Sequence, residues 1–79
     1  MLNKRFSERL NKELDSIGLP EATSERIGAL SKLMKIPKFK AEALLNGITN
    51  SDEALLKTLA EELEVNADWL IGKSDSKAH

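Results

Sequence analysis

Residues 24–45 decide the fold, and they read SERIGALSKLMKIPKFKAEALL. In residues 24–34 the apolar side chains fall at the spacing of one helix face. Residues 38–45 form a second, shorter helical segment. Between the two parts, Lys35, Ile36 and Pro37 break the period, and proline suits the first turn of a new helix because its missing N–H has no partner there anyway. Three residues cannot return the chain so that two long helices pack side by side. The stretch therefore predicts two helices that cross at about 90–120°, as in a helix-turn-helix.

Helical patterns continue on both sides of this stretch. Upstream, Phe6, Leu10 and Leu14 recur every four residues, Asn3 can cap the helix, and Gly18 can end it. Downstream, the apolar residues of 52–63 again fall on one face of a helix, and a shorter helix follows at 67–71. No segment shows the alternation of a strand. The predicted helices cover about residues 3–17, 24–34, 38–45, 52–63 and 67–71.

These patterns predict an all-α fold, a compact domain of five helices over residues 1–72 with a flexible polar tail at 73–79. Thr23 or Ser24 is expected to cap the second helix, and Asn66 the fifth. The chain has 79 residues, of which 41% are hydrophobic and 32% charged, so it is too apolar for a disordered chain.

The composition also excludes several classes of function. There is no cysteine and the single histidine is His79, which argues against a disulfide framework, a metal site and imidazole catalysis. Neither a nucleophile–base pair nor a glycine-rich phosphate loop is present, so we expect no enzyme activity, no cofactor and no small-molecule ligand. The chain lacks the apolar stretch of a signal peptide or a membrane span, which predicts a cytoplasmic protein with no membrane partner.

The net charge of −1 conceals an uneven distribution. Residues 26–41 contain five cations and no acid, whereas residues 42–68 contain seven acids and one cation, Lys57. Because a polyanion responds to the local field, the middle of the chain can face phosphate while the second half remains acidic. A lysine-rich face that is merely solvated is the alternative interpretation.

Four stretches carry a recognisable order: FSERL at 6–10, LNG at 45–47, EALLKTLAEEL at 53–63 and VNADWL at 65–70. With these spacings the chain resembles, over about residues 4–72, the lambda repressor/Cro-like (Xre-type) family of helix-turn-helix DNA-binding domains. The resemblance implies a sequence-specific transcriptional regulator of a prokaryote, phage or mobile element. It also implies double-stranded DNA as the partner and binding as a homodimer.

The resemblance places candidate roles on particular residues. Lys38 can donate to guanine or to phosphate, and Phe39 can pack on a thymine methyl group. The candidates for contacts to bases are Lys38, Phe39, Lys40 and Ala43. The candidates for contacts to phosphates are Arg26, Lys32, Lys35, Thr49 and Asn50. The candidates for the dimer interface are Trp69, Leu70 and Ile71.

Several of these residues also have structural interpretations. Phe39 can pack in the core, Trp69 can close the last helix over the core, and Arg26 can form a surface pair of the i, i+4 type along its own helix. Thr49 and Asn50 can serve in a turn and a helix cap.

The sequence departs from the family pattern at several places. Lys35 stands where a glycine is common, so the turn needs either a left-handed lysine or a different geometry. Ile27 stands where a phosphate-binding glutamine is common, and the loop at 48–51 carries no charge. These departures favour the alternative function, a protein-interaction module that keeps the fold without reading DNA sequence.

Overall fold

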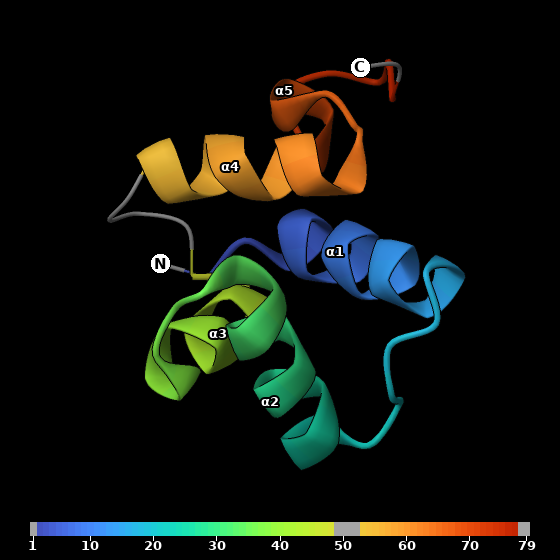
Figure 1. Ribbon diagram of the computed structural model, residues 1–79. Helices are drawn as coiled ribbons and strands as arrows, with labels where there is room; N and C mark the ends of the chain where they lie inside the picture. The colour runs from blue at the N-terminus through green and yellow to red at the C-terminus, as the bar shows by residue number, and fades with distance from the viewer. Residues whose placement is uncertain (1, 49–52, 78–79) are drawn as a thin grey trace.

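Five helices make up the described part of the chain, residues 2–48 and 53–77 of a computed structural model (Figure 1). They are α1 (Lys4–Ser16), α2 (Thr23–Met34), α3 (Lys38–Leu45), α4 (Glu53–Leu63) and α5 (Ala67–Leu70). Each observed boundary lies within one residue of its prediction from the sequence. An isolated antiparallel bridge joins Leu2 and Ile48, and the described residues form no strand. The prediction of an all-α fold is confirmed.

The helix ends show which capping predictions were right. The side chain of Asn3 accepts a hydrogen bond from the N–H of Phe6 at 3.0 Å, and the side chain of Asn66 accepts one from Asp68 at 2.9 Å. The predicted cap at Thr23 or Ser24 was wrong, because α2 begins one residue earlier, after Ala22, with no side-chain cap. 

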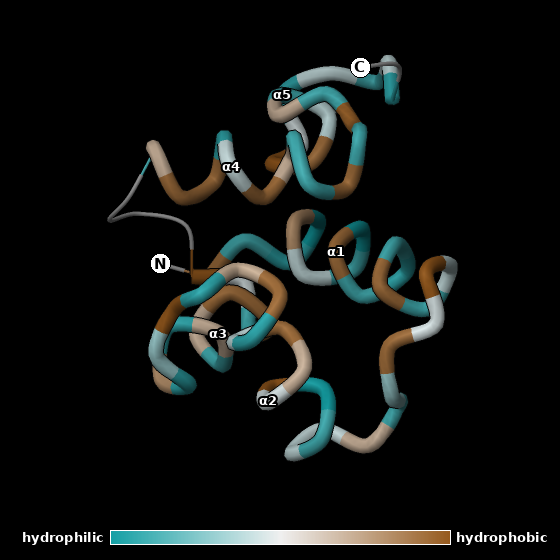
Figure 2. Tube along the Cα trace, in the orientation of Figure 1, coloured by the Kyte–Doolittle hydropathy of each residue, from teal (hydrophilic) through white to brown (hydrophobic). Residues whose placement is uncertain are grey.

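The core is built around α1, which lies between α4 and α5 on one side and α2 and α3 on the other (Figure 1). Phe6, Leu10 and Leu14 of α1 are fully buried, and they meet leucines from the other four helices. Burying each such side chain contributes about 1.5–3 kcal/mol. In Figure 2 the hydrophobic segments of α4 lie along the edge that faces α1. The apolar stripe read from the sequence is therefore the stripe that holds the domain together.

The connection between α2 and α3 is tight. Lys35 adopts the left-handed conformation, with φ 56° and ψ 47°, at the end of α2. The N–H of Ile36 donates to the carbonyl of Ser31 at 3.0 Å, and the hydroxyl of Ser31 donates back to the carbonyl of Ile36. Pro37 caps α3 with an extended backbone. The chain therefore turns into α3 within three residues, and α2 and α3 pack against each other.

Residues 73–77, which we call the C-terminal strap, were expected to form part of a flexible tail, but they lie against the domain. The N–H of Asn66 donates to the carbonyl of Lys77 at 3.1 Å. The ammonium of Lys77 forms an ion pair with Glu13 of α1 at 2.9 Å and lies 5.5 Å from the centre of the Trp69 ring. Backbone and side-chain contacts thus return the strap to α1 and α5. Among the described helices, none has the length and apolarity that a bilayer crossing requires.

Candidate nucleic-acid interface

The first turn of α3 points away from the protein. Lys38, Phe39 and Lys40 are all exposed, and the Phe39 side chain retains 69% of its accessible surface. The buried side of the helix consists of Ala41, Leu44 and Leu45. The alternative that Phe39 packs in the core is therefore wrong. Within residues 2–48 and 53–77, the side chains of Lys38 and Lys40 form no hydrogen bond or ion pair.

The second turn of α3 adds a residue that sequence reasoning missed. Ala43 is half-buried, whereas Glu42 is exposed, three residues after Phe39 and on the same side of the helix. Lys38 precedes Glu42 by four residues, yet the two form no ion pair in the described structure. The signal was present in the sequence, because an acid at this spacing from Phe39 must share its face.

Two of the cations predicted to contact phosphate lie on the surface near α3. Lys32 in the last turn of α2 and Lys35 in the turn are both exposed. Together with Lys38 and Lys40 they give the end of α2, the turn and the start of α3 a positive field. Thr49 and Asn50, the other two surface candidates, lie outside the described residues.

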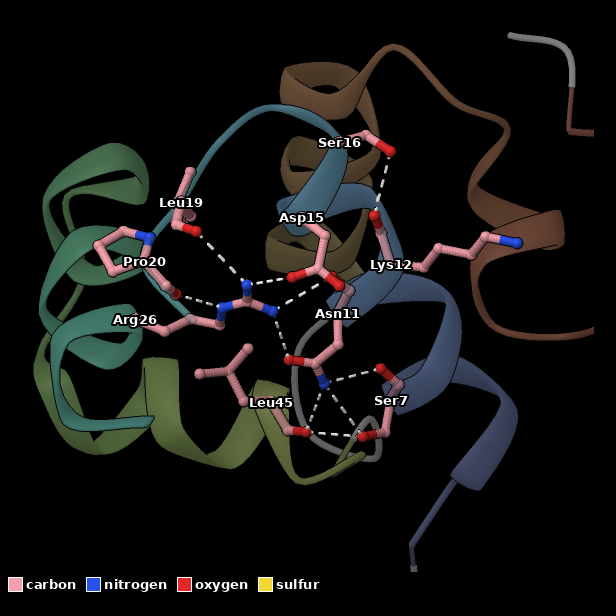
Figure 3. A network of polar contacts seen from close by, with 9 residues as sticks. All are labelled: Ser7, Asn11, Lys12, Asp15, Ser16, Leu19, Pro20, Arg26 and Leu45. Atoms are coloured by element: carbon pink, nitrogen blue, oxygen red, sulfur yellow. Dashed lines mark hydrogen bonds and ion pairs between the residues drawn. The ribbon is translucent and has the colours of Figure 1, made fainter. Parts of the chain in front are cut away.

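Arg26 is not part of this surface, and the prediction that it contacts phosphate is corrected. Its side chain is only 6% exposed, and all three guanidinium nitrogens donate within the protein (Figure 3). Nε donates to the carbonyl of Pro20 at 2.7 Å, one terminal nitrogen donates to the Asn11 side chain at 3.1 Å, and the other is paired with Asp15. Because Asp15 lies on α1, the alternative of a surface pair along one helix is also wrong.

The contacts of Arg26 continue into a polar network that we call the α1 clamp, formed by Ser7, Asn11, Asp15 and Arg26 (Figure 3). The Asn11 amide donates to the carbonyl of Ser7 at 2.9 Å and to that of Leu45 at 3.4 Å, and the Ser7 hydroxyl donates to the same Leu45 carbonyl at 2.7 Å. The clamp therefore holds the start of α2 and the end of α3 on α1. Ser7, Asn11 and Asp15 recur every four residues beside the apolar stripe, which was the signal in the sequence.

The predicted dimer surface on α5 is only partly open. Leu70 is fully buried in the core, so its assignment to the interface was wrong. Trp69 and Ile71 are half-buried and pack against the same core. The guanidinium carbon of Arg9 lies 4.7 Å from the centre of the Trp69 ring, and Arg9 also donates to the backbone carbonyl of Trp69. The core role that the sequence suggested for Trp69 fits this packing.

The arrangement brings an exposed aromatic ring, two unpartnered lysines and one carboxylate together on α3, with two more cations beside them. Within residues 2–48 and 53–77, no three histidine, cysteine or acidic side chains gather as a metal-binding group. Comparisons with protein-family models, with curated proteins and with solved structures found no match. Any role for this surface must therefore be argued from the residues that form it.

Proposed function

We propose that this chain is a sequence-specific DNA-binding transcriptional regulator of the lambda repressor/Cro-like type. In this proposal α2, the turn and α3 form a helix-turn-helix, and α3 is the recognition helix. The observation that carries it is the outward first turn of α3, where Lys38, Phe39 and Lys40 are exposed without partners in the described structure.

The size and chemistry of α3 support this role. A helix with its side chains is about 10–12 Å across, and the major groove of B-DNA is about 12 Å wide. Lysines at the start of such a helix can donate to guanine O6 and N7 or to phosphates. Lys32 and Lys35, which approach from α2 and the turn, can contact the phosphate backbone and fix the register of α3 in the groove.

The α1 clamp supports the proposal because base reading requires a fixed recognition helix. The clamp bonds the start of α2 through Arg26 and the end of α3 through the Leu45 carbonyl. Both helices are thereby held to α1 by contacts that share the Asn11 side chain. A helix held in this way keeps its side chains aligned with base edges at little entropic cost on binding.

A single domain of this size covers little DNA, so we propose that it binds as a homodimer on half-sites about 34 Å apart. Of the residues expected at the interface, Trp69 and Ile71 remain candidates, whereas Leu70 is buried. Analytical ultracentrifugation with and without bound DNA measures the stoichiometry. Two chains per DNA site are expected, and one chain per site contradicts the dimer without contradicting DNA binding.

The function is tested by charge reversal on α3. A bound sequence is first selected from a random duplex library, and gel-shift titrations then measure the affinity of the double variant Lys38→Glu/Lys40→Glu. We expect binding to fall by at least tenfold, with the circular dichroism spectrum and thermal midpoint unchanged, because both side chains are exposed.

The control is the double variant Lys12→Glu/Lys57→Glu, which makes the same change in charge on exposed positions of α1 and α4. It is expected to retain most of the affinity. Unchanged affinity in the α3 variant would show that α3 does not contact DNA.

The second candidate function is a protein-interaction module. The observation in its favour is the 69% exposure of Phe39, because aromatic side chains are enriched at protein interfaces. This function predicts that no sequence is enriched from the random library at any salt concentration. Sequence-specific enrichment at about 150 mM salt excludes it as the sole role of α3.

A further inference from the structure

Phe39 and Glu42 have features that a purely cationic recognition helix does not require. Phe39 is one of only three aromatic residues in the chain, and it leaves 69% of its side chain in water. Glu42 places a negative charge on the surface that is proposed to face phosphates. An exposed apolar side chain adds nothing to a nonspecific electrostatic contact with phosphates, and a carboxylate repels phosphates. The presence of both on this surface therefore points to a specific ligand.

The two side chains lie on the same side of α3. They are three residues apart, which brings their Cβ atoms to about 5–6 Å on a helix. Ala41, Leu44 and Leu45 occupy the buried side, so Phe39 and Glu42 both face outward. Within the described residues, the Glu42 carboxylate accepts no hydrogen bond and forms no ion pair. The surface therefore offers a flat apolar group beside a free acceptor.

The major-groove edges of the bases narrow the possible ligands. Cytosine presents the N4 amino donor, which a glutamate can accept, but it has no methyl group for Phe39. Thymine presents a C5 methyl group, but its neighbouring O4 is an acceptor that repels a carboxylate. A cytosine methylated at C5 presents a methyl group directly beside the N4 donor. It is the pyrimidine whose edge matches both side chains.

We propose that α3 reads a C5-methylated cytosine in duplex DNA, with Phe39 covering the methyl group and Glu42 accepting a hydrogen bond from N4. This inference rests on the proposed DNA-binding function and specifies its ligand. The paired guanine presents O6 and N7 on the same edge, within the chemistry of Lys38 or Lys40. The lysines on either side of Phe39 also offset the negative charge of Glu42 near the phosphates.

The experiment begins with two random duplex libraries, one containing cytosine and the other containing 5-methylcytosine in its place. The full chain selects from each library, and the best duplex is remade with 5-methylcytosine, cytosine or thymine at each selected cytosine, keeping the pairing intact. Removing the methyl group at the position that α3 reads is expected to weaken binding about fourfold, the effect of exposing one methyl group. Thymine at that position is expected to weaken binding about tenfold or more, because Glu42 then faces an acceptor.

Two variants assign the preference to its residues. Phe39→Ala is expected to bind the cytosine and 5-methylcytosine duplexes equally, because the methyl group then lacks its apolar cover. Glu42→Gln is expected to reduce the discrimination against thymine, because the amide can donate to O4, and the remaining discrimination comes from the paired adenine, which presents a donor where guanine offers O6 to the lysines. The matched controls are Ile17→Ala, at an apolar residue 53% exposed after α1, and Glu62→Gln, at an exposed acid of α4. Both controls are expected to keep the preference for methylated cytosine.

The outcomes separate this inference from the proposed function. Sequence-specific binding with equal affinity for cytosine and 5-methylcytosine overturns the inference and leaves the proposed function standing. A preference for methylated DNA that persists in Phe39→Ala overturns the assignment to α3. Failure of both libraries to yield an enriched sequence overturns the proposed function and the inference together.

Discussion

A guanidinium that leaves water is stable only when its donors find other acceptors, and Arg26 meets this condition with groups from α1 and from the loop that follows it. Pro20 supplies a backbone carbonyl, Asn11 supplies a side-chain oxygen, and Asp15 supplies the countercharge. Asp15 itself is largely exposed, so water screens the ion pair. The stability that Arg26 provides therefore comes mainly from hydrogen bonds that tie the loop after α1 to the start of α2.

Replacing Arg26 with alanine is expected to reduce the free energy of unfolding by about 2–4 kcal/mol, because several partly buried acceptors lose their donor. Arg26→Lys should recover little of this loss, because a single ammonium cannot reach acceptors arranged around a planar fork. Urea denaturation measures both effects. The control is Lys32→Ala at an exposed position of α2, which should change stability by less than about 0.5 kcal/mol. A loss for Arg26→Ala as small as that of the control would contradict the role of the clamp.

Among the elements, the turn between α2 and α3 holds one residue, Lys35, in a strained backbone conformation. Lys35 has φ 56°, a conformation that costs a residue with a Cβ atom about 1–2 kcal/mol relative to its ordinary one. Glycine adopts the same conformation without that cost. The tight turn between α2 and α3 is thus maintained by the packing of the two helices and by the Ser31–Ile36 hydrogen bonds.

Lys35→Gly is therefore expected to stabilise the domain by about 1 kcal/mol, since it relieves the left-handed conformation. Lys32→Gly, in the helical part of α2, should instead destabilise it by about 1 kcal/mol, because there the extra freedom of glycine is lost on folding. Thermal unfolding of the two variants beside the native protein measures the difference. A destabilised Lys35→Gly would show that the lysine side chain contributes to the turn.

The helices were predictable because local signals determine them, whereas parts of the site depend on contacts between distant residues. The apolar period placed each boundary within one residue, and the break before Pro37 predicted the turn into α3. The outward direction of Phe39 required knowing which side α1 and α2 bury. Burial of Arg26 depends on acceptors up to fifteen residues away, and burial of Leu70 on the packing of α5 against α1. The periodicity of a single helix therefore could not predict the burial of Arg26 or of Leu70.

In the whole molecule, the cluster of cations and the cluster of acids seen in the sequence lie on different helices. The exposed cations Lys32, Lys35, Lys38 and Lys40 belong to α2, the turn and α3. The exposed acids Glu61, Glu62 and Glu64 lie at the end of α4 and just after it. Figure 1 shows α4 and the α2–α3 pair on opposite sides of α1. A polyanion approaching this protein is thus oriented toward α3 before contact is made.

The proposed binding to DNA should therefore weaken steeply with salt. If Lys32, Lys35 and Lys40 each neutralise one phosphate, a dimer releases about six counterions, and the logarithm of the affinity should fall with a slope of about −5 against the logarithm of salt concentration. Gel-shift titrations between about 50 and 200 mM salt measure the slope. Lys32→Ala should make it less steep by about 2, one contact being lost from each copy. A slope of the native protein close to zero would contradict phosphate contacts by this surface.

The contacts around Trp69 have a practical consequence. This residue is the single tryptophan of the chain, and two cations from distant parts of the sequence, Arg9 and Lys77, lie close to its ring. Indole emission responds to nearby charge and to water, so both release of the C-terminal strap and loss of the core alter the same optical signal. Lifting residues 73–77 removes Lys77 and the Ser74 carbonyl that accepts a hydrogen bond from Arg9 at 3.1 Å, whereas full denaturation removes Arg9 as well. The protein thus carries an intrinsic spectroscopic reporter that can follow docking of residues 73–77 without any attached dye.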